Sequence, residues 1–588
     1  MTRPRLLLHF CRARPAPELV PGPDPKQLLA GDGVSTVALQ RCQVACWEAA
    51  MTAREPSTGS LGAARLNTAL YNARESRTQR DRSVMESLPS DLLDELNFQR
   101  ATEEEATSWR NHLPPEPWQA PVEAAAHEVG EWVKSRLEAG VPNARGAVVS
   151  VRKAGQSTRP VPIVGVAERI AYRALTDHLL EGVPPAARSV EDYRRFATGP
   201  ISYGVRSSAN RFRRISDSKI THVVESDVTA FYQYVDHETL RQELVLQTGR
   251  VKAAEALREL LREISGASYG LPQMLDASDE LSEIYIRILE RDIARRGIPV
   301  WRYNDDFRIA VNSYEAAQSA VEQLSESAAS LGLVLGEHKT YISRFSTYFM
   351  RYADVEDPEE LERFDPDAVF VDSGYVLEPD QAVEVAIGTL ARLDLPPGDP
   401  ARIDLKSASG ADLRQLRRAL SILRAAGDPA ALERTTHLML FTPSLTPRVC
   451  EYLSDLHTGY PDDVAASWEA LYMNHSSSLS QWQLAWLTYV ARTADLLQGH
   501  PERIAAVKRQ QLKREHVLLH AEACLTLSEV AAVPADELDR ALRTQPEPLV
   551  PWYVLAVGNM RRHGAIEAGI FNAVRDSSPF WRTLLGER

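Results

Sequence analysis

Residues 300–311 constrain the fold of this chain more than any other segment. Their sequence, VWRYNDDFRIAV, places two strand-forming stretches on either side of an Asn-Asp pair, which suits a tight hairpin turn. The segment therefore predicts a β-hairpin that carries two carboxylates, Asp305 and Asp306, at its tip. Adjacent aspartates are also common as solvated turn residues, so this hairpin indicates a catalytic site only if a second segment brings another carboxylate next to it.

The partner lies upstream in residues 221–232, THVVESDVTAFY, where an apolar strand ends at Asp227 and an aromatic pair follows. Phosphoryl transfer with two metal ions needs carboxylates from separate strands that converge on cations about 4 Å apart. Strands that end at Asp227 and at the hairpin meet this need. Mg²⁺ is the expected ion because it prefers carboxylate and phosphate oxygens, and without a cation the clustered carboxylates would raise one another's pKa.

The distribution of charge matters more here than its sum. A net charge of −13 argues mildly against a nucleic-acid partner, because phosphate binding needs clustered Lys and Arg. Residues 145–215, however, contain 13 basic side chains against five acidic ones, a local excess of +8. Such a run is often a solvated face, but this one directly precedes the carboxylate motifs, which favours binding to a polyanion.

The order of the motifs resembles that of reverse transcriptases. Residues 227–232 resemble the first palm motif of that family, and residues 303–306, Tyr-Asn-Asp-Asp, resemble its Y-x-D-D box. Residues 270–273, GLPQ, resemble its G-L-P-Q motif, and residues 331–340 resemble the palm motif that follows. Residues 201–206, ISYGVR, resemble a segment of bacterial retroelement enzymes. Met274 departs from the pattern, since related enzymes usually carry Gly there.

The resemblance implies a catalytic centre with two Mg²⁺ ions, for which Mn²⁺ is an alternative. The implied metal site consists of Asp227, Val228, Asp305 and Asp306. Lys339 falls where the family carries a candidate general acid for the pyrophosphate leaving group, although a solvated surface lysine is an equal alternative.

The resemblance also implies a deoxynucleotide site. Its basic residues would grip the triphosphate, where Arg offers paired donors and Lys a compact charge. Tyr232 matches the bulky position that excludes a ribose 2′-hydroxyl, and the Gln of the G-L-P-Q motif lines the nucleotide pocket. The predicted nucleotide-binding residues are Arg152, Lys153, Arg159, Phe231, Tyr232, Gln273 and Tyr303.

A chain of 588 residues exceeds what one hydrophobic core normally supports, so we expect several units. The predicted fold class is α+β: a right-hand polymerase core with fingers and palm, followed by an all-α, repeat-like domain. Trp468, Trp482, Trp486 and Trp552 of that domain are expected in its core. The expected units are an N-terminal appendage, mostly helical and irregular (1–120), basic fingers (121–216), a palm with the catalytic carboxylates (217–355), an acidic linker (356–381) and a helical domain (382–588).

These features predict an RNA-directed DNA polymerase with an RNA template or noncoding RNA, a DNA product and dNTPs as partners. Analogy with bacterial enzymes that join a polymerase core to helical repeats suggests antiphage defence by abortive infection. Template-independent, protein-primed DNA synthesis, RNA synthesis, and a catalytically degenerate RNA-binding scaffold remain as alternatives, and homo-oligomerisation remains open. Five sparse cysteines and the lack of a membrane-spanning apolar run predict a cytoplasmic protein without a membrane partner.

Overall fold

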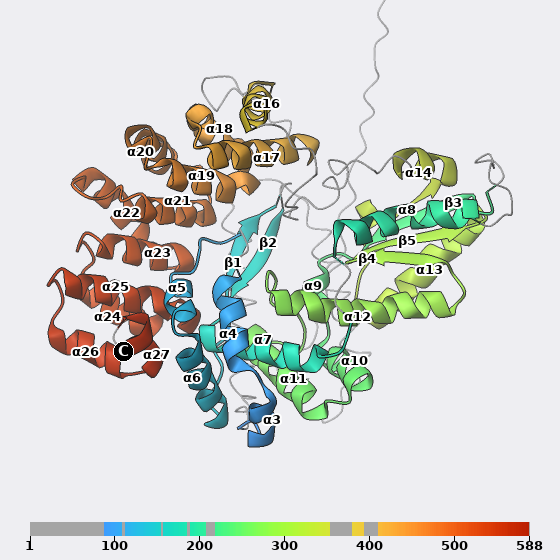
Figure 1. The fold of residues 1–588 in the computed structure, drawn as a ribbon, viewed down its shortest axis with the longest axis horizontal. Helices are drawn as coiled ribbons and strands as arrows, with labels where there is room; N and C mark the ends of the chain where they lie inside the picture. The colour runs from blue at the N-terminus through green and yellow to red at the C-terminus, as the bar shows by residue number, and fades with distance from the viewer. Residues whose placement is uncertain are drawn as a thin grey trace, which may run out of the picture. The chain divides into compact units, whose positions relative to one another are not determined.

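The computed structural model describes residues 87–108, 112–153, 157–184, 188–206, 218–352, 379–392 and 410–586 (Figure 1). All of them belong to one compact unit, residues 83–588. The Pro-rich part of the predicted appendage and most of the predicted acidic linker lie outside these ranges.

A four-stranded antiparallel sheet, in the order β4-β5-β3-β6, organises the centre of the α+β core. The predicted hairpin at 300–311 is confirmed as β4 and β5, and the predicted strand before Asp227 is confirmed as β3. The register places Asp227 directly opposite Asp306 on the neighbouring strand. The strands are β3 (His222–Asp227), β4 (Val300–Tyr303), β5 (Asp306–Val311) and β6 (Tyr341–Arg344).

Helices cover both faces of this sheet, because successive side chains of each strand point to opposite sides. Val224 and Ile309 face each other and pack into one hydrophobic core, whereas Val223 and Ala310 pack into a second core. Asp227 shares the strand parity of Val223 and therefore belongs to the second face. The first face is covered by α12 (Asp276–Arg295) and α13 (Tyr314–Ser330), and the second by α8 (Val190–Arg206) and α14 (Phe345–Tyr352).

The basic segment contains a two-stranded antiparallel hairpin of β1 (Ala147–Arg152) and β2 (Thr158–Ile163). Val151 pairs with Arg159, so Arg159 lies on the same face of β2 as the buried Val161 and Ile163. Pro160 and Pro162 are tolerated because both strands of a two-stranded hairpin keep an open edge.

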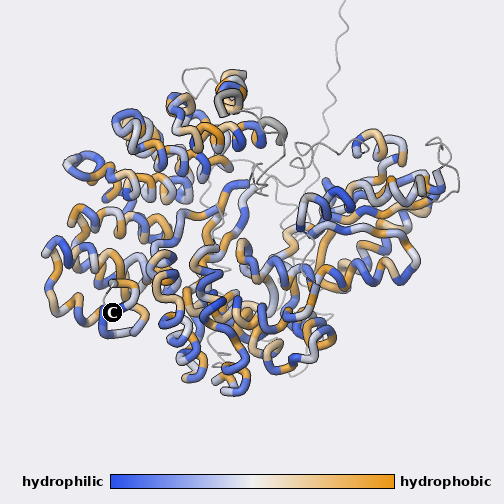
Figure 2. Tube along the Cα trace, viewed as in Figure 1, coloured by the Kyte–Doolittle hydropathy of each residue, from blue (hydrophilic) through white to orange (hydrophobic). Residues whose placement is uncertain are grey.

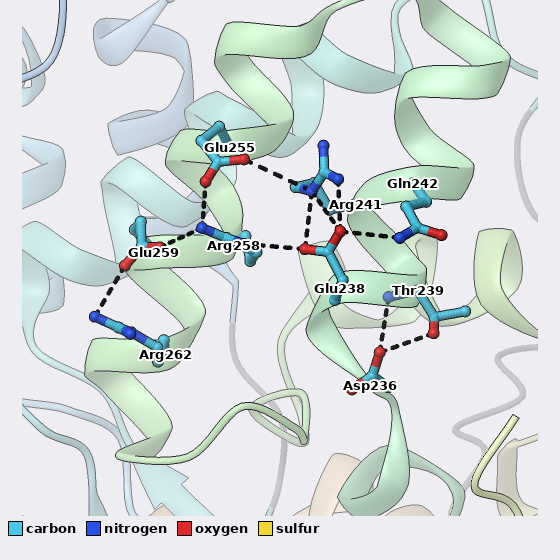
Figure 3. A network of polar contacts seen from close by, with 9 residues as sticks. All are labelled: Asp236, Glu238, Thr239, Arg241, Gln242, Glu255, Arg258, Glu259 and Arg262. Atoms are coloured by element: carbon cyan, nitrogen blue, oxygen red, sulfur yellow. Dashed lines mark hydrogen bonds and ion pairs between the residues drawn. The ribbon is translucent and has the colours of Figure 1, made fainter. Parts of the chain in front are cut away.

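Helices α7 (Val166–Leu180), α9 (Phe231–Tyr234), α10 (His237–Thr248) and α11 (Val251–Ser265) complete the core. Ion pairs join α10 to α11, as Figure 3 shows. Glu238 accepts from Arg241 and Arg258, and these hydrogen bonds, together with one from Gln242, lower the pKa of Glu238 to about 2. This network lies at the surface and holds the two helices in register.

The helices that precede β1 share the core of the polymerase region. They are α3 (Ser90–Glu95), α4 (Phe98–Thr107), α5 (Gln119–Glu123) and α6 (Ala126–Glu138). Helix α4 packs against α6 and α7, and a Cβ atom at Gly130 would lie 3.1 Å from the backbone of Phe98. Residues 98–107, which the sequence assigns to an appendage, are thus closely packed against helices on the other side of residue 120.

Within residues 379–392 and 410–586, every regular element is helical, and hydrophobic and hydrophilic residues alternate along the helices (Figure 2). Helices α17, α19, α21, α23 and α25 form a row in which each packs against the next. The four tryptophans predicted as core residues are at most 3% exposed, which confirms that prediction. The helices are α16 (Pro379–Arg392), α17 (Gly410–Ala426), α18 (Thr435–Phe441), α19 (Thr446–Leu456), α20 (Pro461–Glu469), α21 (Gln481–Thr493), α22 (Pro501–Gln511), α23 (Val517–Ser528), α24 (Ala535–Thr544), α25 (Val550–Arg562), α26 (Ala568–Asp576) and α27 (Pro579–Leu584).

None of the helices in the described ranges is long and apolar enough to cross a lipid bilayer.

Candidate active site

Three aspartates gather at one end of the central sheet. Asp227 closes β3, Asp306 opens β5, and Asp305 lies in the two-residue turn between β4 and β5. The Val228 amide donates to the Asp305 carbonyl (3.2 Å), which ties the end of β3 to the turn. The structure therefore brings together the four residues predicted to hold metal.

The turn has a local and a long-range cause. Asn304 has a φ of +51°, and Asn adopts this left-handed conformation more readily than most residues. Arg302 donates through Nη1 to the Asn304 carbonyl (2.9 Å) and to the buried Glu283 of α12 (3.0 Å). A buried ion pair thus fixes the turn that presents Asp305.

A third segment, residues 334–336, runs alongside the end of β3. The Gly336 amide donates to the Asp227 carbonyl (2.7 Å), and the Thr229 amide donates to the Val334 carbonyl (2.8 Å). A Cβ atom at position 336 would lie 3.3 Å from Asp227 Oδ2, tighter than nearly all real contacts. Glycine at position 336 thus allows this segment to approach the carboxylate.

Lys339 follows this segment in a short 3-10 turn and reaches the aspartates. Its Nζ lies 3.0 Å from Asp227 Oδ1, although 67% of its side chain remains exposed. Burial opposes the charged amine, but Asp227, Asp306 and Asp305 together raise the pKa of Lys339. The lysine is thus protonated at neutral pH and forms an ion pair in the site, so it differs from an isolated surface lysine.

The proximity of the carboxylates has an electrostatic cost. Burial, followed by the negative charges of Asp227 and Asp306, raises the pKa of Asp305 from 3.8 to about 7, while Lys339 partly offsets this. In the metal-free protein, Asp305 therefore keeps its proton up to about neutral pH.

A divalent cation fits this donor set chemically. The residues offer carboxylate oxygens, which Mg²⁺ prefers, and a cation would favour the ionised form that burial and repulsion disfavour in Asp305. Within the described ranges, no three Asp, Glu, His or Cys side chains converge closely enough to form a finished metal site. Lys339 instead engages one of the Asp227 oxygens.

Tyr232, which is predicted to bind nucleotide, is held by side chains from two other segments. Its hydroxyl donates to Asp279 Oδ1 (2.6 Å), and Asp279 forms an ion pair with Arg188 (2.9 Å). Burial and the charge of Asp279 raise the pKa of Tyr232 to about 12. The Tyr303 hydroxyl donates to the Arg188 carbonyl (3.1 Å), so both predicted tyrosines meet at Arg188.

Phe231 lies buried beside Tyr232, with ring centroids 5.6 Å apart. The Tyr232 carbonyl accepts from the Leu271 amide (2.7 Å), which joins this aromatic pair to the GLPQ segment. The segment that carries Phe231 and Tyr232 is therefore in direct backbone contact with the GLPQ segment.

The remaining residues predicted to bind nucleotide lie around the β1–β2 hairpin and the end of the GLPQ segment. Arg159 Nη1 lies 3.5 Å from the sulfur of Met274, and Gln273 and Met274 line a cavity of about 50 Å³. That volume holds water rather than a nucleotide. Arg152 and Lys153 lie at the tip of the β1–β2 hairpin, with Lys153 exposed.

Two groups of functional side chains escaped sequence reasoning. Glu225, only 1% exposed, lies two residues before Asp227 and pairs with Arg308, two residues after Asp306 (3.4 Å). The alternation of β3 could have signalled this pair, because a charged residue inside an apolar strand requires a partner. Arg188 and Asp279, by contrast, carry no local signal of their contact with Tyr232.

A comparison with models of protein families finds a match over the part of the chain that contains the three aspartates. The sequence model of the family described as "Reverse transcriptase (RNA-dependent DNA polymerase)" matches residues 151–362. No curated protein sequence matches the chain.

Among solved structures, the chain is similar to apo telomerase from Candida tropicalis truncated from its C-terminal domain, with 9% identity over 34% of this chain and 50% of that chain and a TM-score of 0.25. It is also similar to telomerase from Candida albicans in complex with a fragment of telomeric RNA, with 10% identity over 62% of this chain and 64% of that chain and a TM-score of 0.29. The chain thus covers 50% of the length of the first of these proteins and 64% of the length of the second.

The family match covers the sheet with its three aspartates, the GLPQ segment and most of the β1–β2 hairpin. The predicted α+β fold, with a fingers and palm core followed by helices, is confirmed. Residues 151–362, about a third of the chain, thus match a reverse-transcriptase domain, which is a nucleotidyltransferase domain of the RNA-directed DNA polymerase class.

Proposed function

We propose that this chain adds dNTPs to a growing DNA strand by two-metal-ion catalysis at Asp227, Asp305 and Asp306, with RNA as the template. One observation carries the proposal. Asp227 and Asp306 face each other on adjacent strands, and together with burial they raise the pKa of Asp305 between them. Such a concentration of negative charge is costly for a purely structural turn and suits a cation site.

Asp227, Val228, Asp305 and Asp306 would hold the ions, Mg²⁺ or alternatively Mn²⁺. Bound there, the ions would lower the pKa of the attacking 3′-hydroxyl and neutralise the leaving pyrophosphate. Lys339 keeps its proton at neutral pH and lies at the edge of the carboxylate cluster, where it can donate that proton to the leaving group.

The chain's other residues would select and orient the nucleotide. Arg159, with Arg152 and Lys153, would bind the triphosphate, and Gln273 would line the pocket. Because Asp279 fixes the Tyr232 hydroxyl, the ring has a defined position from which it can exclude a ribose 2′-hydroxyl. Deoxynucleotides are therefore the proposed substrates.

Incubation with Mg²⁺ and labelled dNTPs, with and without an RNA template, tests the proposal. Product that requires the template and remains free of protein supports it. Template-independent product linked covalently to the protein would instead support protein-primed synthesis, and equal use of rNTPs would support an RNA polymerase. RNA binding without any incorporation would support a degenerate scaffold.

We further propose a role in antiphage defence, probed by plating phage on bacteria that express the chain or its Asp305→Ala variant. The combination of a polymerase core with a large helical region supports this role. Equal plating on both hosts would contradict it. The two cysteines within the described ranges, Cys450 and Cys524, are buried thiols, as suits the proposed cytoplasmic location.

A further inference from the structure

The C-terminal helical region contacts the polymerase core at a segment that leads to the nucleotide site. Helix α21 lies against β1, and two of its tryptophans, one helical turn apart, reach the same backbone atom. Trp482 Nε1 donates to the His112 carbonyl (2.5 Å), and Trp486 Nε1 donates to the same oxygen (3.3 Å). Both indoles are almost fully buried, so each needs this acceptor.

The His112 side chain faces the nucleotide residues. Arg159 Nη1 donates to His112 Nε2 (3.5 Å) and lies at the same distance from the Met274 sulfur. Because a guanidinium cannot accept a hydrogen bond, the histidine must be the acceptor in this contact. The ring therefore fixes one side of an arginine whose proposed partner is the triphosphate.

Residues near His112 in the sequence also contact the polymerase core. Arg169 of α7 bonds the Ser108 carbonyl (3.2 Å) and forms buried ion pairs with Glu105 and with Glu116 (3.3 Å). Ser108 and Glu116, four positions before and after His112, are thus attached to the core, while the His112 carbonyl is attached to α21. A shift of α21 relative to the core would therefore act directly on His112.

We propose that the C-terminal helical region positions Arg159 for nucleotide binding, through Trp482 and Trp486 on the His112 backbone and through the His112 ring on the guanidinium. His112 is thus a positioning residue. The inference rests on the proposed role of Arg159. It gives the helical region a specific role, because whatever displaces α21 changes the affinity of the polymerase for dNTPs.

Met274 belongs to the same arrangement. It holds a left-handed backbone conformation, with a φ of +71°, that glycine adopts at less cost. Its sulfur contacts Arg159 from the side of the GLPQ segment. The methionine that replaces the usual glycine therefore contributes the second contact that orients this arginine.

Steady-state incorporation by the full chain tests the proposal with a double variant, Trp482→Phe and Trp486→Phe. Phenylalanine retains most of the packing but cannot donate to His112. We expect the KM for dNTP to rise about fivefold, the effect of a hydrogen bond of about 1 kcal/mol, with kcat unchanged. His112→Ala should act similarly, and His112→Gln, which keeps an acceptor, should restore part of the loss.

Trp552→Phe is the matched control. Trp552 is similarly buried in the helical region, but its indole donates to Glu522 of α23 (2.8 Å), and neither residue lies on α21. This variant should lose similar thermal stability with an unchanged KM. An unchanged KM in the double variant, alongside a raised KM in Arg159→Ala, would overturn the inference and leave the proposed function intact. An unchanged KM in Arg159→Ala would overturn both the inference and the role of that arginine.

Hydrogen exchange of the β2 amides tests positioning without any polymerase activity. Faster exchange of the Arg159 and Val161 amides in the double variant than in Trp552→Phe supports the proposal. Equal exchange in the two variants would overturn it, whatever the outcome for the proposed function.

Discussion

Substitution of Asp306 by Asn should make the metal-free protein relatively more stable as the pH rises from 5 to 8. The pKa of Asp305 rises from 3.8 in the unfolded chain to about 7 in the folded one. Its ionised form is therefore disfavoured by folding, and stability is lost as the pH rises from about 4 to about 7. A shift of about three pH units corresponds to about 4 kcal/mol.

Asp306 accounts for a part of this loss. Burial is the largest cause of the shift, Asp227 the second and Asp306 the third. A share of about one pKa unit for Asp306 corresponds to roughly 1 kcal/mol. At pH 5 Asp305 is protonated in the folded protein with or without Asp306, so the repulsion is absent there. The difference in unfolding free energy between variant and wild type should therefore become about 1 kcal/mol more favourable to the variant at pH 8.

Thermal unfolding at both pH values in the presence of EDTA measures this change. Asp292→Asn is the control, because hydrogen bonds from Ser327 and Arg296 lower the pKa of Asp292 and keep it ionised from pH 5 to 8. Its effect on stability should be the same at both pH values. A flat profile for Asp306→Asn, matching that of the control, would refute the proposed repulsion between the carboxylates.

The geometry of the site leads to three further expectations. Binding of Mg²⁺ at pH 6 should release a proton from Asp305, and binding should be tighter at pH 8 than at pH 6. Calorimetry in two buffers of different ionisation enthalpy measures the proton release, and its absence at pH 6 would contradict this expectation. Replacing Arg302 by Met removes the donor to the Asn304 carbonyl and a partner of the buried Glu283. The free energy of unfolding in denaturant should therefore fall by about 3 kcal/mol, and a decrease below about 0.5 kcal/mol would contradict the role of Arg302 in fixing the turn. Tyr232→Ala should raise the use of rNTPs relative to dNTPs in kcat/KM, whereas unchanged discrimination would remove Tyr232 from sugar selection.

The catalytic hairpin could be predicted from sequence because its signals are local. The turn needs a residue that accepts a left-handed conformation, and Asn304 supplies one between two strand-forming stretches. The pairing of β3 with β5 joins residues at least 79 positions apart, and it followed from the requirement that carboxylates converge. The need for convergent carboxylates thus indicated a long-range contact that the hydrophobic periodicity of the strands alone does not indicate.

Contacts that depend on tertiary packing could not be predicted in this way. Trp482 was expected to be a core residue and is one, yet hydropathy gives no indication that its N–H reaches His112, 370 residues earlier. The packing of α4 against α6 likewise depends on the shapes of both helices and on the absence of a side chain at Gly130.

Catalysis at the three aspartates is tested most directly by nucleotide incorporation by Asp305→Ala beside the wild-type chain, with Mg²⁺, labelled dNTPs and a primed RNA template. We expect incorporation by the wild type and none by the variant, while circular dichroism shows the variant to be folded. Incorporation by a folded Asp305→Ala variant at the wild-type rate would contradict catalysis at these aspartates.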